Sequence, residues 1–322
     1  MNINRVLIGV ILTLVAFVFS CNQDTTVKIS GTISNPVNDS IVISGPNVNK
    51  TLKLSENGEF LDTISISTNM YTLTHGRERT SMFLKANHSL SISIDAADFD
   101  KSLIYSGKGS SDNNYLAAKT LNLSVNPVDY KSMYSMDEGE FINHINETKA
   151  NDIAFIDSFE KNNTVLDNEL KSIELKEINY KYLLSIQRYP VYYKFYAKKE
   201  PKTSDLFDKD LKNIDYINNN DYVNSPSYKS LVLAHFFNQE KLSNNIKTHF
   251  SDLLDANAPD IKKDIVSQGK YYLSASSENN ESLYNSLIEM SNDSTQTAEL
   301  TDIYNKLQLI KKGMKSPEFF DY

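Results

Sequence analysis

The chain contains a single cysteine, Cys21, and that count limits its sulfur chemistry. A disulfide, a CxxC redox pair and a cysteine-based zinc site each need at least two thiols, so none of them can form within this chain. Cys21 follows Ser20 directly after an apolar segment, and a cysteine behind a small residue at that place is typical of bacterial lipidation sites. We therefore predict that Cys21 carries a lipid anchor and is no catalytic thiolate.

The segment before Cys21 has the pattern of an export signal. The positive charge of Arg5 precedes residues 6–19, which form an apolar run of 14 residues. A run this short falls below the roughly 20 residues that cross a bilayer, which favours a signal peptide over residues 1–20. Residues 21–24 would then be the lipidated N-terminus and a linker. The alternative is an ordinary secretory signal that ends beside a chance cysteine.

Residues 106–111, with the sequence SGKGSS, raise the question of a phosphate-binding loop. A Walker loop requires a glycine five residues before the Gly-Lys pair, and a serine or threonine after the lysine. Here Ser102 stands at the first position, and Gly109 follows Lys108. We therefore interpret the segment as a glycine-rich turn that leads into a helix.

Glu140, His144 and Glu147 are spaced by four and three residues in a segment with helical periodicity, so they share one face. Side chains of these types at this spacing can ligate a metal ion when a second helix supplies matching ligands. No comparable His-acid pair occurs elsewhere in the sequence. The pattern therefore favours a solvated polar face over a metal site.

The remaining histidines lack the companions that a catalytic or metal site needs. His75 lies beside Arg77, Glu78 and Arg79, where a weak anion contact is conceivable, but a solvated charged loop or edge strand is the interpretation that we favour. His235 and His249 stand 14 residues apart without further ligands, and no Gly-x-Ser-x-Gly elbow is present. We predict no catalytic residue, no metal site and no cofactor.

Two kinds of periodicity define the elements that carry these residues. Over residues 25–112 apolar and polar positions alternate, which predicts short, half-buried strands. The turn residues Asn57-Gly58 and Asn87-His88 predict two hairpins. Several short strands with frequent turns indicate an antiparallel β-sandwich or a partly open barrel.

Helical spacing follows over residues 113–312, so the fold class is α+β by domain, with an all-α second domain. Ser225-Pro226 predicts a helix N-cap and first residue. Pro190 and Pro201 interrupt or bound a helix whose tyrosines we expect to pack between helices with their hydroxyls in water. These tyrosines are Tyr180, Tyr182, Tyr192, Tyr193 and Tyr196.

Composition sets outer limits on the function. The chain has 322 residues, of which 40% are hydrophobic and 23% charged, which is typical of a globular protein with more than one domain. The net charge of −8 and the pI of about 5.2 give no support to nucleic-acid binding, which needs clustered cations.

The end of the chain carries a family resemblance. Residues 307–322, LQLIKKGMKSPEFFDY, resemble the stretch that enters the thioredoxin-like domain of Bacteroidetes TlpA-type thiol-disulfide oxidoreductases, where a Ser-Pro-x-Phe segment follows a helix ending in Lys-Gly. Residues 25–118 are similar to the DUF4369-type β domain of that family, with NGEF at 57–60 as its hairpin and residues 107–115 as its closing stretch. Residues 279–312 resemble its last helices.

The resemblance implies a thioredoxin-like domain whose WCxxC site follows this stretch by a few dozen residues, and residues 313–322 would be the start of that absent domain. No position of the sequence matches the catalytic cysteines. We therefore expect the non-catalytic portion of a cell-envelope oxidoreductase, which anchors it in the membrane and presents substrate or partner.

The expected partners are the membrane, through the lipid, the missing thioredoxin-like domain, and envelope client proteins. The single acid in residues 22–24 favours a periplasm-facing location. The alternative is a complete, non-enzymatic envelope lipoprotein that binds a ligand or a protein partner. A periplasmic hydrolase would require an assembled nucleophile or metal site.

Overall fold

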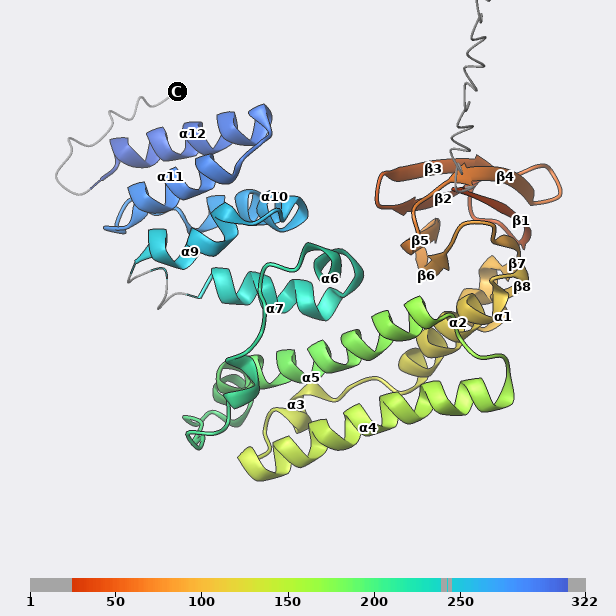
Figure 1. Ribbon diagram of the computed structural model, residues 1–322, viewed down its shortest axis with the longest axis horizontal. Coiled ribbons are helices and arrows are strands. Elements are labelled where there is room, and N and C mark those ends of the chain that lie inside the picture. The colour runs from red at the N-terminus through yellow and green to blue at the C-terminus, as the bar shows by residue number, and fades with distance from the viewer. Residues whose placement is uncertain (1–24, 239–241, 243–244, 312–322) are drawn as a thin grey trace, which may run out of the picture.

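The structure is a computed structural model that describes residues 25–238, 242 and 245–311 (Figure 1). The predicted signal peptide, the lipidation site Cys21 and residues 313–322 lie outside these described residues. The described chain is 55% helical and 19% strand, with two sheets followed by helices. The predicted α+β fold class is therefore confirmed.

Eight strands form two four-stranded sheets. The first has the strand order β4-β1-β7-β8, and the second has the order β3-β2-β5-β6. All neighbours are antiparallel except β1 and β7, which run parallel. The strands are β1 (Thr26–Ser34), β2 (Ser40–Gly45), β3 (Val48–Lys53), β4 (Glu59–Ser65), β5 (Asn69–His75), β6 (Glu78–Leu84), β7 (Ser89–Asp95) and β8 (Ile104–Lys108).

The alternating residues of the strands meet in one apolar core between the two sheets. On β1, Val27 and Ile29 are fully buried, whereas the intervening Lys28 is exposed. The central strands of the other sheet contribute Ile43 and Leu73, which are equally buried. Since side chains alternate between the faces of a strand, the period of two in the sequence decides which residues enter this core.

Both predicted hairpins are wrong, because each turn joins strands of different sheets. The turn at Asn57-Gly58 leads from β3 to β4, and the turn at Asn87-His88 leads from β6 to β7. Gly58 does supply the positive φ that the turn needs, at 74°. Turn residues determine where the chain reverses direction. Which strands pair with one another depends on how the apolar faces of the strands pack, and this packing involves residues that are distant in the sequence.

The helices are α1 (Phe99–Ser102), α2 (Ser110–Val125), α3 (Tyr130–Met133), α4 (Glu138–Asn162), α5 (Asn168–Ala197), α6 (Asn219–Asn224), α7 (Pro226–Phe236), α9 (Ile246–Asp255), α10 (Pro259–Gly269), α11 (Asn280–Met290) and α12 (Ser294–Leu309), with 3-10 turns η1 (Ala96–Asp98), η2 (Lys209–Leu211) and η3 (Lys270–Tyr272). No helix within the described residues is long and apolar enough to cross a membrane.

The long helix α5 connects the two halves of the molecule (Figure 1). The sandwich and α2 lie near its N-terminal end, α4 runs beside it, and α7 packs on it from the side of the C-terminal helices. Helix α5 passes through Pro190 and continues to Ala197, so this proline does not end it, and Pro201 lies beyond its C-terminus. The predicted start of α7 is confirmed: the Ser225 hydroxyl caps the helix by accepting the N–H of Tyr228 at 2.9 Å.

Candidate functional site

His75 has a structural role. It is almost fully buried, its Nδ1 donates to the carbonyl of Ser40 at 2.9 Å, and its Nε2 accepts the N–H of Val37 at 3.0 Å. The ring therefore secures the segment that leads into β2. Our interpretation of His75 as part of a solvated, charged group is wrong, because that segment, distant in sequence, folds over it; the neighbouring Arg77 and Arg79 are exposed.

Residues 106–111 lead from the sandwich into α2: residues 106–108 are the end of strand β8, Gly109 forms the turn, and α2 begins at Ser110. Gly107 and Gly109 have φ values of 89° and 94°, and a Cβ on Gly109 would lie 2.4 Å from Nδ1 of His88. The two asparagines that follow bond to the sandwich backbone. Asn113 pairs with both the N–H and the carbonyl of Phe83, at 2.9 and 3.0 Å. A glycine turn that leads into a helix is therefore confirmed at Gly109, but residues 106–108 belong to a strand, because they pair with β7.

Glu140, His144 and Glu147 lie on α4, where Glu140 and Glu147 are exposed and His144 is partly buried. Within the described part of the chain, no group of three or more His, Cys, Asp or Glu residues could hold a metal ion. The fold brings His235 and His249 together, with ring centroids 5.2 Å apart. They stand in an aromatic cluster, in which the ring of His235 stacks on Tyr216 at 3.8 Å.

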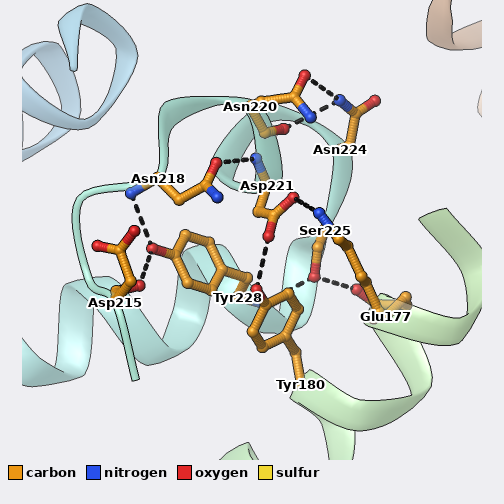
Figure 2. Close-up of polar contacts among 10 residues, drawn as sticks. Glu177, Tyr180, Asp215, Asn218, Asn220, Asp221, Asn224, Ser225 and Tyr228 are labelled. Atoms are coloured by element: carbon orange, nitrogen blue, oxygen red, sulfur yellow. Dashed lines mark hydrogen bonds and ion pairs between the residues drawn. The ribbon is translucent and has the colours of Figure 1, made fainter. Parts of the chain in front are cut away.

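A network of buried polar groups joins α5 to α6 and α7 (Figure 2). Asp221 of α6 is 4% exposed and accepts from Lys176 Nζ at 2.7 Å and from the Tyr180 hydroxyl at 2.6 Å. One turn away on α5, Glu177 accepts from the hydroxyl of Ser225 and stands beside Ser227, whose hydroxyl donates to it at 2.6 Å. Asp221 thus holds α6 against α5, and Glu177 holds the start of α7 against α5.

The same network includes a buried phenol. The Tyr228 hydroxyl donates to the carbonyl of Asp215 and accepts the N–H of Asn218 at 3.1 Å (Figure 2). Burial and the negative charge of Asp221 raise the pKa of Tyr180 far above its ordinary value. The carboxylates of Asp221 and Glu177 and the Tyr228 hydroxyl all have partners within the protein, so we regard the network as a structural joint between the helices.

A second joint holds α5 to α2 and the sandwich. Glu174 of α5 is 3% exposed and accepts from the Tyr115 hydroxyl at 2.8 Å and from Lys119 Nζ at 2.7 Å. Burial raises the pKa of Tyr115, and the neighbouring carboxylate adds to this effect. We expected tyrosine hydroxyls of α5 to reach water; this is wrong for Tyr180, whose hydroxyl donates to the buried Asp221, whereas the bond of the Tyr182 hydroxyl to Asp210 is exposed. The spacing of the tyrosines along α5 could not reveal the carboxylates of other segments that accept hydrogen bonds from their hydroxyls.

The best candidate for a binding site is a cavity of about 450 Å³ between α3, α4 and α5, which we call the α3–α5 cavity. Its apolar wall comes from Met133, Ile145, Ile178 and Leu184, and Tyr134 is buried beside it. Its charged and polar wall consists of Asp129, Tyr130, His144, Thr148, Lys149, Asp152, Lys181, Tyr182, Ser185 and Arg188.

The charges in the α3–α5 cavity are unequally compensated. Asp152 pairs with Lys181 at 2.8 Å, and Asp129 caps α3 by accepting the N–H of Ser132 at 3.0 Å. Lys149 donates to the amide oxygen of Asn179 at 2.7 Å. Arg188, which is partly buried, forms no hydrogen bond or ion pair with any residue that the structure describes. The cavity therefore holds a cation whose donors are all available to a ligand.

Tyr134, beside Arg188, is held in its neutral form. Burial raises the pKa of Tyr134 to about 12, although the Arg188 charge acts in the opposite direction. The rings of Tyr134 and Tyr192 meet edge to face at 4.8 Å, which fixes the wall of the cavity. Of the cavity residues, only His144 and Tyr182 were singled out in the sequence; Arg188 carries no local signal.

Comparison with known proteins adds no relative. No family model, curated protein or solved structure matches this chain.

Proposed function

We propose that the chain is the non-catalytic, membrane-anchored portion of a cell-envelope thiol-disulfide oxidoreductase of the TlpA-like type. The observation that supports it is the order of the elements. A β-sandwich is closed by the Gly109 turn and α2, and a helical region follows and ends in α12. This is the order that the resemblance of residues 25–118 and 279–312 implies.

The role of this portion follows from its chemistry and from its joints. Thiol-disulfide exchange needs an attacking thiolate and a second, resolving cysteine, and the sequence offers Cys21 alone. The buried joints at Glu174 and Asp221 hold the sandwich, α5 and the C-terminal helices together. In the proposal, this body holds a thioredoxin-like domain at the membrane and presents substrates or envelope partners to it.

Two experiments test the proposal. The first examines the reading frame beyond codon 322: an open frame that encodes WCxxC supports the proposal, and a stop codon without a neighbouring thioredoxin-like frame contradicts it. The second assays the purified mature chain for insulin reduction, where we expect no rate above a control with dithiothreitol alone. Turnover by this chain alone would overturn the non-catalytic assignment.

Anchoring is tested separately, by phase partition. In a host with the bacterial lipoprotein pathway, we expect the wild-type chain to enter the detergent phase and the Cys21→Ser variant to appear as a soluble or unprocessed form. Ser20→Ala, which keeps a small residue before the cysteine, serves as the matched control. If Cys21→Ser partitions like the wild type, the anchor lies elsewhere.

The α3–α5 cavity favours a second candidate function, a complete envelope lipoprotein that binds a ligand. Its volume falls in the range of about 300–1,000 Å³ that is typical of small-molecule sites. The reading-frame experiment separates the two candidates, because only the oxidoreductase requires a thioredoxin-like domain.

A further inference from the structure

We propose that the α3–α5 cavity binds an organic carboxylate with an apolar or aromatic body, and that Arg188 recognises its carboxylate. This inference concerns the cavity itself and holds for either candidate function. It rests on the combination of a cavity of about 450 Å³, an apolar wall and one uncompensated guanidinium, all within the helical region.

The charge argument starts from the acids of the cavity. Asp129 and Asp152 are both engaged, the first by the N-terminus of α3 and the second by Lys181. Neither contacts Arg188, so its guanidinium charge is unpaired within the described residues. A partly buried charge without a partner costs free energy, and an anionic ligand would remove that cost. The chain as a whole carries −8, so a positively charged cavity is a local feature and not the consequence of a basic protein.

The type of anion follows from the geometry of its partner. A guanidinium offers paired N–H donors in one plane, which match the two oxygens of a carboxylate. Lys149 provides a second positive charge, although its Nζ already donates to Asn179 and lies 4.7 Å from the centre of the Tyr182 ring. One planar cation beside aromatic rings favours a single carboxylate over a polyphosphate, which would need several free cations.

The body of the ligand follows from the remaining wall. Ile145, Ile178 and Leu184 face the cavity, and Tyr130, half exposed, stands at its margin. An apolar or aromatic group of the ligand would cover these side chains and gain burial. Such a molecule could be a free acid or the C-terminus of a peptide with an apolar last residue.

The test is titration calorimetry of the chain without its predicted signal peptide and lipidation site, residues 25–322, with 3-phenylpropanoate and its amide. We expect the acid to bind. The uncharged amide should bind with an affinity at least about tenfold lower, because it lacks the charge that Arg188 would hydrogen-bond. The dipeptides acetyl-Ala-Phe and acetyl-Ala-Phe-amide form the second pair. Tighter binding of the peptide acid assigns the site to peptide C-termini, and tighter binding of the free acid assigns it to small organic acids; both support the carboxylate.

The variants locate the binding. Arg188→Gln should weaken the acid about tenfold or more and leave the amide unchanged. Arg188→Lys retains the positive charge but lacks the planar guanidinium, so its affinity for the acid should lie between those of the wild type and Arg188→Gln. Arg77→Gln, an exposed arginine of the β5–β6 turn, is the matched control and should bind like the wild type. Thermal unfolding confirms that each variant is folded.

The acid and amide comparison needs no variant, so a folding defect cannot mask the result. Equal affinity of the acid and the amide for the wild type would overturn the inference. So would failure of both acids to bind at millimolar concentration, or unchanged binding by a folded Arg188→Gln variant.

Discussion

The sandwich and the helical region bury their side chains in different ways. The sandwich has one main cluster of 20 buried hydrophobic residues, which extends to α1 and α2, whereas the described helical region divides its core among several clusters, one of them with 18 buried residues. Between these clusters, tyrosine hydroxyls donate to buried carboxylates. Such contacts join Tyr115 to Glu174 and Tyr180 to Asp221, and Tyr222 donates in the same way to the partly exposed Asp264.

The difference teaches how each region specifies its structure. In the sandwich, apolar alternation alone sorts residues into a continuous core, and its strands need no polar contact to choose the inner face. Two helices can pack with several different rotations about their own axes. A buried carboxylate excludes most of these rotations, because it needs a hydrogen-bond donor on the neighbouring helix. We infer that the hydroxyl–carboxylate contacts select the arrangement of the helical region, in the way that buried polar groups fix register in other helical proteins. The following variants test this contrast, from the largest expected effect to the smallest.

Loss of a core side chain should have the largest effect, in the sandwich. Leu73 of β5 is fully buried, so Leu73→Ala should lower the free energy of unfolding by about 2–5 kcal/mol, through lost burial and a cavity. Urea unfolding followed by circular dichroism measures it. Leu61→Ala, on the exposed face of β4, is the control and should change stability by less than about 0.5 kcal/mol. Similar losses in both variants would refute the single-core description.

Loss of a buried carboxylate should come next, in the helical region. Glu174→Ala leaves the buried Tyr115 hydroxyl without its acceptor, and we expect a loss of about 2–3 kcal/mol. Asp302→Ala, which removes an exposed ion pair with Lys306 on α12, should have almost no effect. Hydrogen exchange should show faster exchange in α2 and α5 of the Glu174 variant. Protection there equal to the wild type would show that this contact does not hold the joint.

Loss of one hydroxyl should cost less than loss of the acceptor. In Tyr180→Phe, Asp221 keeps its bond to Lys176, so the expected cost is about 1 kcal/mol. The matched control is Tyr271→Phe, since Tyr271 is 78% exposed and should tolerate the change. If Tyr180→Phe matches its control in chemical denaturation, Lys176 alone satisfies the carboxylate and the phenol adds no specificity.

The smallest expected effect is a pH dependence at the closed end of the sandwich. Burial lowers the pKa of His88 below its ordinary value of 6.5, so the folded state prefers the neutral ring. The contribution of the neutral His88 ring to the free energy of unfolding is complete above pH 6.5. It is lost as the pH falls below that value, because the unfolded chain then binds the proton more readily than the folded chain. The difference in urea midpoint between about pH 7.5 and about pH 5.5 should be larger for wild type than for His88→Gln. A larger difference in the variant would reverse the sign and exclude this role.

The sequence by itself determined the local features of both regions. Alternation predicted half-buried strands, in one of which Val27 and Ile29 lie on the inner face, and Ser225-Pro226 marked the start of α7, because both features depend on residues close together in the chain. The need for glycine at Gly109 was also visible as a turn before a helix, although its close contact with His88 was not.

Only the tertiary structure decided which distant groups meet. It placed the Asn57-Gly58 turn between two sheets, buried His75 under the segment before β2, and brought Asp221 to Tyr180. It also gathered the residues of the α3–α5 cavity around Arg188. The physical reason is the same in each case: strand pairing, burial and hydrogen bonds between separate segments depend on the whole folded surface, and a periodic pattern in one segment contains no information about the segment that will cover it.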